Sequence, residues 1–212
     1  DNGKVGESRE EAIPAGTIFL EMLHAAPQPV TIKLTARLDS LKDARRTDQY
    51  QDAVLGYQLP SGNWVDYEIK VKLRGRFRRM KCDFPPLKLN FDKDELNDQG
   101  LAEHDKLKLV THCVDSEKAE QTVIKEWLCY QLYQQLTPIS YQSCLVEVLY
   151  QDMVDTAVSF TQMGILLEST DELAQRLGGE EREVFNPPDS ILDPYNQLVH
   201  DLFQFMIGNQ DY

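Results

Sequence analysis

Residues 71–91, VKLRGRFRRMKCDFPPLKLNF, combine alternating side chains with a concentration of positive charge. Apolar and cationic residues alternate from Ile69 to Arg78, which is the pattern of a half-exposed β-strand. Pro85 and Pro86 interrupt this pattern, and the following LKLNF predicts a further strand with Lys88 on its polar side. The stretch therefore predicts two successive strands, each with cations opposite its apolar face.

The positive charge of this stretch contrasts with the rest of the chain. Residues 70–88 carry eight lysines and arginines and one aspartate, a net charge of +7, whereas the whole chain has a net charge of −13, which leaves −20 for the remainder. The cations are either the solvated face of a strand, where they discourage edge-to-edge association, or a surface that binds an anion. The pattern alone leaves both interpretations open.

Length and composition narrow the class of protein. A chain of 212 residues with 42% hydrophobic residues suits one domain, or one domain of two lobes. No apolar run is long enough to span a membrane, and the overall acidity disfavours nucleic acid as a partner, because duplex binding needs a broad basic surface. The first residues show no signal peptide, but the chain does not begin with Met, so a processed, exported protein stays open.

The cysteines predict no zinc site. They form no CxxC pair and have no histidine at metal-ligand spacing, and we expect no other metal site in this chain either. A bridge between Cys82 and Cys113 would suit an exported protein, although spacing alone does not decide the pairing. Cys129 and Cys144, among apolar neighbours, are predicted to be buried thiols.

Hydrophobic patterns along the chain predict an α+β protein. We expect strands at residues 29–38, on either side of a turn at 60–63, and at 87–91, 106–113, 144–150 and 160–167. Helices are predicted at 116–136, with a stripe that includes Trp127, Leu128, Leu132 and Leu136, at 170–178, and at 195–207, with a core stripe of Leu198, Leu202, Phe205 and Met206. The expected fold is an antiparallel sheet of five or more strands with the helix at 116–136 packed against it.

Signatures of common enzyme classes are absent from the sequence. There is no GxSxG, HExxH, GxxxxGK[ST] or GxGxxG motif, and RLGGE at 176–180 is typical of a helix end. What remains is an ordered set of elements: a basic strand, a lysine on the next strand, a helix with Glu120 and Glu126, a strand that ends in Glu168, and a terminal GNQDY.

In this order the elements resemble the small lobe and hinge of a protein-kinase-like fold, and their motifs resemble the CotH spore-coat kinase-like family. VKLRGRFRR followed by FPPLKLNF is similar to the family pattern RGN…FPKKSYKLKF, and DKLKLVTHCVDSEKAEQTVIKEWLCYQLYQQL is similar to the family's strand and following helix. GILLES resembles the hinge-side strand, and LFQFMIGNQDY resembles the helix before the GNxD…HN segment. The resemblance covers residues 65–212 and points to secreted members of Bacteroidetes type.

The resemblance implies an atypical protein kinase with a tail at residues 1–16, a small lobe at 17–168, and a hinge and incomplete helical lobe at 169–212. Such a protein binds ATP with Mg²⁺ and transfers phosphate to a protein hydroxyl; which protein is the substrate is unknown. The implied site residues are Arg74 and Lys88 on the nucleotide phosphates, Glu126 orienting them, Glu168 near the hinge, Asn209 at the start of the catalytic loop, and Asp211 as the catalytic residue.

The chain departs from the family pattern in two places. FPPLK has two prolines where the family has paired lysines, which reduces the positive charge beside a nucleotide. The HN pair and the metal-binding aspartate would follow Tyr212, so we expect this chain alone to be inactive, either as a fragment of a longer protein or as a branch without activity. The alternative function is a non-catalytic extracellular binding or assembly module whose basic strand, residues 70–81, binds an anionic polymer or an acidic partner.

Overall fold

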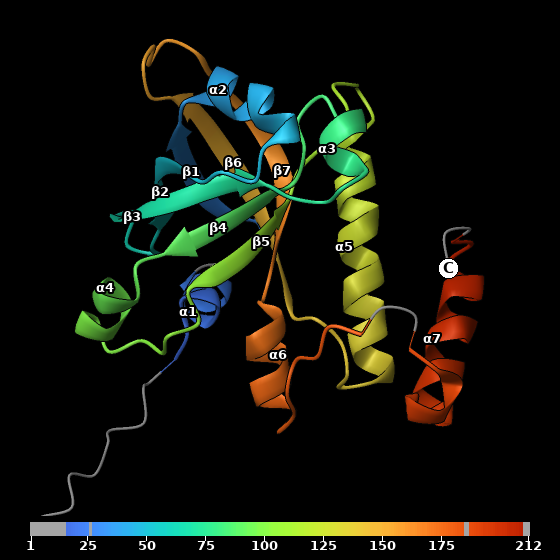
Figure 1. The fold of residues 1–212 in the computed structure, drawn as a ribbon. Helices are drawn as coiled ribbons and strands as arrows, with labels where there is room; N and C mark the ends of the chain where they lie inside the picture. Colours follow the sequence, from blue (N-terminus) through green and yellow to red (C-terminus); the bar gives the residue numbers. More distant parts are fainter. Residues whose placement is uncertain (1–15, 26, 185–186, 210–212) are drawn as a thin grey trace, which may run out of the picture.

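The computed structural model describes residues 16–25, 27–184 and 187–209, and this part of the chain contains a closed barrel of seven strands (Figure 1). The strands are β1 Val30–Ala36, β2 Gln51–Gln58, β3 Trp64–Leu73, β4 Leu87–Phe91, β5 Lys106–Val110, β6 Ser143–Asp152 and β7 Ser159–Leu167. The α-helices are α1 Ile18–Ala25, α2 Leu38–Asp43, α3 Arg78–Lys81, α4 Lys93–Asp98, α5 Ala119–Leu136, α6 Thr170–Arg176 and α7 Pro194–Met206. Short 3-10 helices lie at Ala44–Arg46 and Asp189–Ile191.

One parallel strand pair closes the barrel. Strands β1 to β5 are antiparallel neighbours in sequence order, β5 pairs with β7, and β7 pairs with β6. Strand β6 then runs parallel to β1, with Val30 opposite Val146 and Ala36 opposite Asp152. The expected α+β kinase-like lobe with an antiparallel sheet is therefore wrong. The strands that the sequence predicts form instead a mixed barrel, which leaves no open sheet edge.

Alternation along each strand fills the interior of the barrel. Leu34, Val71, Leu89, Leu107 and Val146 are fully buried there, and on β1, β3, β4 and β5 mainly polar residues occupy the alternate positions on the outer face. Gly164 of β7 also belongs to a tightly packed layer, because a Cβ atom at this position would lie 3.1 Å from the Leu109 side chain. The apolar strand faces that the alternating pattern predicts thus line the interior of the barrel.

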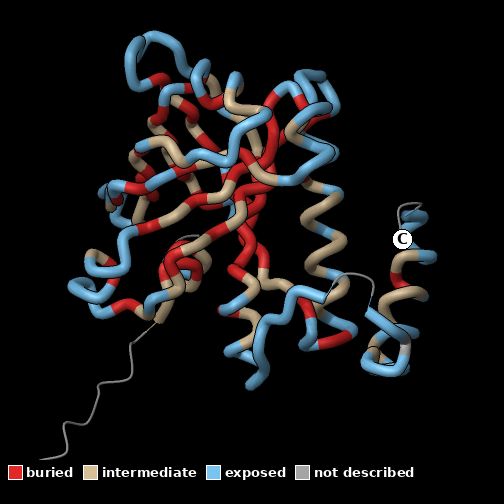
Figure 2. The backbone as a smooth tube through the Cα atoms, in the orientation of Figure 1, coloured by how far each residue is buried: buried red, intermediate tan, exposed pale blue. Residues whose placement is uncertain are grey.

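Helix α5 covers the outer face of β5, β7 and β6 and makes a second apolar cluster. Val123 of this helix packs with Val110, Leu145, Ile165 and Leu167 of the strands, flanked by Trp127, Tyr130 and Tyr141. The predicted helix stripe is partly wrong, because Leu128, Leu132 and Leu136 are exposed. Figure 2 shows buried residues in the barrel and mainly intermediate and exposed ones along α5.

Helix α7 packs on α5 through a side chain that the expected core stripe omitted. Phe203 is the buried residue of α7, and its ring lies 4.8 Å from that of Tyr133 on α5. The expected core residues Leu198, Leu202, Phe205 and Met206 are instead exposed. None of the helices in the described residues is long and apolar enough to cross a membrane.

The basic strand ends earlier than the alternation predicts. Strand β3 stops at Leu73, Gly75 adopts a φ of +78°, and the chain continues into α3. Arg76 and Arg78 therefore leave the face of the strand, and Phe77, expected on the apolar side, is 72% exposed. The Arg45 guanidinium fixes this turn by donating to the carbonyl oxygens of Arg79 and Asp83, and also to that of Cys82.

A disulfide joins Cys82, just after α3, to Cys113, just after β5. It is the pairing that the sequence left open. A single β-bridge between Phe84 and Cys113 runs beside it. Of the tail expected at residues 1–16, all but Gly16 lies outside the described residues.

Candidate anion-binding site

The strand register brings lysines from three strands together on the outer face of the barrel. Lys88 of β4 lies opposite Lys72 of β3 on one side and Lys108 of β5 on the other. Adjacent strands are about 4.8 Å apart, so the three side chains leave the sheet as one row. Together with Lys70, Arg74 and Lys106 on the same outward phase, they form what we call the cationic face.

Several members of the cationic face already have partners. Lys72 Nζ lies 2.8 Å from Asp48 and 4.6 Å from the centre of the Tyr50 ring, and Lys106 pairs with Asp105 at 3.1 Å. Lys108 Nζ donates hydrogen bonds of 3.0 Å to the hydroxyl oxygens of Tyr141 and Thr170. Lys72 and Lys106 therefore have less free charge to offer an external anion, whereas the two hydroxyl partners of Lys108 are neutral and leave its charge uncompensated.

Lys88 and Arg74 differ from these lysines. Among residues 16–25, 27–184 and 187–209, neither side chain makes a hydrogen bond or an ion pair, although both are only partly exposed. Half-buried cations without a partner favour an anion, because its charge replaces the solvation that they have lost. Lys88 and Arg74 are therefore the side chains best placed to bind an anionic group.

The pKa shifts of Lys88 and Arg74 are consistent with an anion-binding role for these two side chains. Burial, together with the neighbouring cations Lys106, Lys72 and Lys108, lowers the pKa of Lys88 from its ordinary value. Burial likewise lowers the pKa of Arg74, which nevertheless stays charged at neutral pH. A negative charge bound here would relieve the repulsion between the cations and stabilise the protonated form of Lys88.

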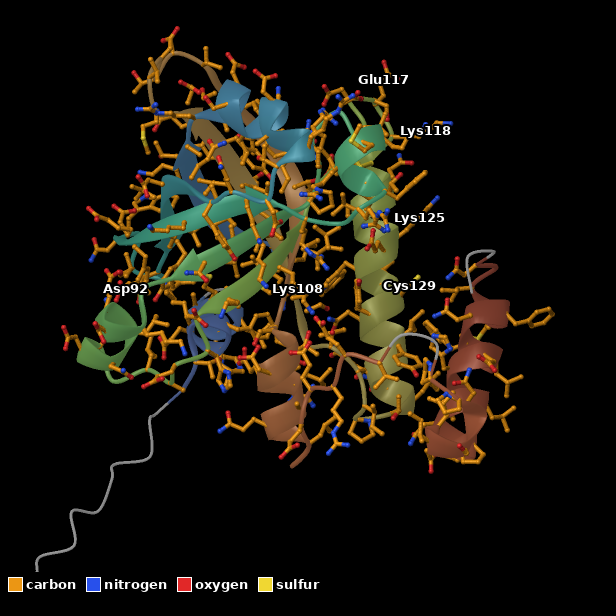
Figure 3. All side chains as sticks on the ribbon, in the orientation of Figure 1. Asp92, Lys108, Glu117, Lys118, Lys125 and Cys129 are labelled. Atoms are coloured by element: carbon orange, nitrogen blue, oxygen red, sulfur yellow. A yellow bond between two sulfur atoms is a disulfide. The ribbon has the colours of Figure 1, made fainter. Side chains whose placement is uncertain are left out.

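Two cavities open at the cationic face, and Lys108 lines both (labelled in Figure 3). The first, which we call the α5 cleft, is about 400 Å³ and lies between Arg74 and the α5 side chains Glu126 and Tyr130, with Tyr141 beside them. Burial raises the pKa of Tyr130 to about 12, so that its hydroxyl stays neutral. The cleft therefore places aromatic rings beside cations.

The second cavity lies on the other side of Lys108. We call it the connector cavity; it measures about 510 Å³, with Lys88, Lys106 and Lys108 on one side. Thr170 at the start of α6 and two glutamates of the connection to α7, Glu181 and Glu183, line the other side. The two cavities thus share one row of lysines.

The structure brings together part of the set of site residues that the sequence predicts. Arg74 and Lys88 share the cationic face, and Glu126 faces Arg74 across the α5 cleft. The Glu126 carboxylate lies 3.7 Å from Arg78 Nη1, however, and makes no ion pair with Lys88. Glu126 therefore links α5 to α3 in this structure.

The other predicted site residues lie elsewhere. Glu168 is fully buried, and its carboxylate accepts hydrogen bonds from Arg176 and from the backbone N–H of Gln142. The Asn209 side chain donates to Gln204 at the end of α7, which Figure 1 shows on the far side of α5 from the barrel. Asp211 lies outside the described residues.

Sequence reasoning missed Lys108 and the two tyrosines of the α5 cleft. Lys108 could have been found, because it occupies the polar phase of the KLKLV alternation just as Lys88 does in LKLNF. Tyr130 and Tyr141 gave no such signal. Tyr130 lies on a helix whose buried face was misjudged, and Tyr141 lies in the connection between α5 and β6.

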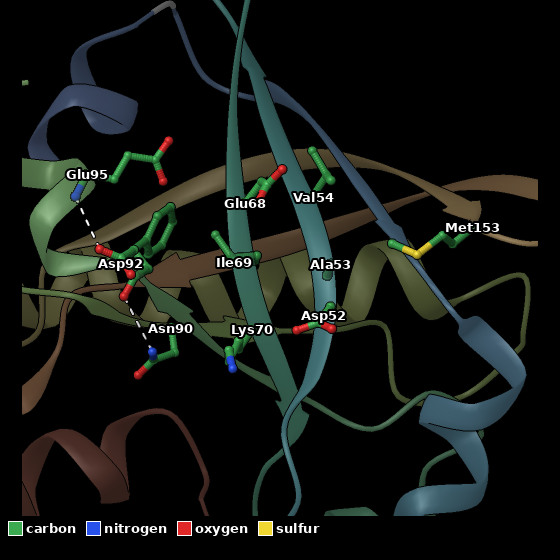
Figure 4. Close-up of a pocket in the computed structure, with 11 residues that line it drawn as sticks. Asp52, Ala53, Val54, Glu68, Ile69, Lys70, Asn90, Asp92, Glu95 and Met153 are labelled. Atoms are coloured by element: carbon green, nitrogen blue, oxygen red, sulfur yellow. Dashed lines mark hydrogen bonds between the residues drawn. The ribbon is translucent and has the colours of Figure 1, made fainter.

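A further cavity on the barrel does not suit an anion. It measures about 550 Å³ and lies over β2, β3 and β4, with four carboxylates, Asp52, Glu68, Asp92 and Glu95, and one lysine, Lys70 (Figure 4). Asp92 caps α4 by accepting from the backbone N–H groups of Asp94 and Glu95. Among the described residues, no group of three or more His, Cys, Asp or Glu side chains is placed to hold a metal ion, so no residue is assigned to Mg²⁺.

Comparisons with family models, with curated proteins and with solved structures find no match to this chain. The resemblance to the CotH family therefore rests on its sequence motifs.

Proposed function

We propose that the chain binds a phosphate-bearing ligand, with ATP as the first candidate, through Arg74, Lys88 and Lys108. The single observation that carries this proposal is the row of cations in an otherwise acidic protein, in which Lys88 and Arg74 make no ion pair or side-chain hydrogen bond within the described residues. Arginine forks and lysine ammonium groups are the usual donors to phosphate oxygens. Tyr130 and Tyr141 in the adjoining cleft offer aromatic faces for a planar base.

Replacing Lys88 by alanine is expected to weaken ATP binding by about 10- to 100-fold, because a charge-assisted hydrogen bond contributes about 1.5–3 kcal/mol. The wild-type protein should show a rise in melting temperature with ATP, with and without Mg²⁺, and Lys88→Ala should remove most of this rise. Tripolyphosphate and adenosine, tested separately, distinguish recognition of the phosphates from recognition of the base.

The matched control is Lys125→Ala, which removes an exposed lysine from α5 that does not line the α5 cleft (labelled in Figure 3). This variant should keep the wild-type response to ATP. If the wild-type protein shows no response to either ATP or tripolyphosphate, the proposed function is wrong.

Transfer of the γ-phosphate to a protein hydroxyl is the further step that the family resemblance implies. It stays a prediction, because its catalytic residue, Asp211, lies outside the described residues and Glu168 is committed to Arg176. An exported location is part of the same proposal. The Cys82–Cys113 disulfide supports it, since structural disulfides persist in oxidising compartments.

A second candidate function, binding of an anionic polymer without catalysis, is favoured by the exposure of Arg76, Arg78 and Lys81 around α3. If these side chains bind such a polymer, Arg76→Ala with Arg78→Ala should elute from a heparin column at clearly lower salt than the wild-type protein, because each lost phosphate-like or sulfate contact reduces the salt dependence of binding. Unchanged retention would exclude this candidate. A variant of equal charge change, Lys93→Ala with Lys125→Ala, controls for net charge.

A further inference from the structure

An acidic segment of the chain faces the cations of the proposed site. Residues 180–183, EERE, follow α6 after Gly178 and Gly179. Two of these residues, Glu181 and Glu183, line the connector cavity together with Lys88, Lys106 and Lys108. The segment thus brings negative charge to the place where the proposed function puts the negative charge of a ligand.

The acidic segment is close to the lysines without being locked to them. Neither Glu181 nor Glu183 makes an ion pair within 4.0 Å in the described part of the chain, whereas Glu180 pairs with Arg182 at 3.8 Å. Asp171, which lines the same cavity, is already paired with His104 at 3.2 Å. Unpaired charges of opposite sign across a cavity attract one another over about 8–10 Å at ordinary ionic strength.

The backbone of this segment can move away at low cost. Gly178 adopts a φ of +67°, and residues 180–184 belong to no helix or strand and are exposed. The neighbouring apolar side chains, Leu177 and Val184, are 39% and 49% exposed, so neither anchors the segment in a core. Segments with few buried contacts and exposed backbones open with small free-energy changes.

We propose that residues 180–183 act as a built-in competitor that reduces the affinity of the cationic face for anionic ligands. This inference rests on the proposed function, since it describes how the same site is regulated. Glu181 and Glu183 supply part of the counter-charge that Lys88 and Lys108 lack, and a phosphate-bearing ligand displaces them. The affinity for ATP is therefore lower than the cations alone would give.

The test compares ATP affinity, measured by isothermal titration calorimetry at fixed ionic strength, between the wild-type protein and Glu181→Gln with Glu183→Gln. Loss of two partly screened attractions is expected to strengthen ATP binding by about three- to tenfold. The matched control is Glu117→Gln with Glu120→Gln, which removes the same charge from exposed residues that do not line the cavity. It should change the affinity less than about twofold.

Failure of this inference can be distinguished from failure of the proposed function. If Lys88→Ala weakens ATP binding but Glu181→Gln with Glu183→Gln leaves it unchanged, the proposed function stands and the competitor does not. An equal gain in the Glu117→Gln, Glu120→Gln control would show a general charge effect and would also overturn the inference. If neither the wild-type protein nor the Glu181→Gln, Glu183→Gln variant binds ATP, both proposals are wrong.

Discussion

Replacing Cys82 and Cys113 together by serine is expected to lower the free energy of unfolding by about 3–4 kcal/mol. The disulfide joins residues that are 31 apart in sequence, and the cost follows from the chain entropy that a crosslink of this span removes from the unfolded state. Cys82 is also only 1% exposed, so its replacement disturbs a packed site. Urea unfolding followed by circular dichroism measures the change.

Reduction of the wild-type protein provides an independent check. Dithiothreitol should lower the midpoint of unfolding of the wild-type protein toward that of the double variant and should leave the double variant unchanged. Cys129→Ser, which alters a thiol on α5 outside the disulfide, should unfold close to the wild-type midpoint. A double variant as stable as the wild-type protein would mean that the disulfide does not stabilise the fold.

Replacing Arg176 by alanine is expected to lower the free energy of unfolding by about 3 kcal/mol, because it leaves a buried carboxylate without its cation. Arg176 Nη2 lies 2.7 Å from the Glu168 carboxylate, which is completely buried. Within the described residues, Glu168 forms an ion pair with no other cation. The same guanidinium donates to the carbonyl oxygens of Pro138 and Ser140. Arg176 therefore connects α6, through hydrogen bonds, to the residue that follows β7 and to the connection between α5 and β6. Urea unfolding measures the loss.

Two variants separate the buried pair from a general loss of an arginine. Arg182→Ala removes an exposed arginine whose partner, Glu180, is also exposed, and it should change stability by less than about 0.5 kcal/mol. Adding Glu168→Gln to Arg176→Ala should restore part of the stability, because a neutral amide is less costly to bury than an unpaired carboxylate. If Arg176→Ala and Arg182→Ala are equally stable, the buried pair does not stabilise the fold.

The sequence predicted strands better than it predicted their pairing. The period of two located most of the barrel strands and the turn at residues 60–63, because each depends on neighbouring residues alone. Whether β6 lies beside β1, and in which direction, depends on contacts between segments far apart in the chain. No local pattern records such a contact, so the closed barrel was missed and an antiparallel sheet was expected.

Helix faces were predicted less well than strand faces. In α5, apolar side chains surround much of the helix: Val123 packs on the barrel, whereas Leu132 and Leu136 are exposed. A pattern with apolar residues on several sides does not identify the buried side. In α7 the apolar residues do gather on one face, but Leu198 and Leu202 on that face stay exposed, and Phe203 is the residue that packs.

The residues of the candidate site could be predicted only where they follow the alternation of inward and outward side chains along a strand. Arg74 and Lys88 share one face because both follow the outward phase of their strands, and Lys108 obeys the same rule. Glu181 and Glu183 approach these lysines from a connection without regular structure. Their position depends on how α6 and the turn after it are oriented, which sequence periodicity does not record.

The parallel pairing of Val30 with Val146 also constrains how the chain acquires its structure. We call the β1–β6 pairing the seam of the barrel. During synthesis on the ribosome, β1 is made before its parallel partner β6, which follows only after β2 to β5 and α5. Until then one side of β1 offers unpaired backbone groups to any other nascent chain. Contacts so distant in sequence slow the search for the native state, so we expect closure of this seam to be the slow event in biogenesis.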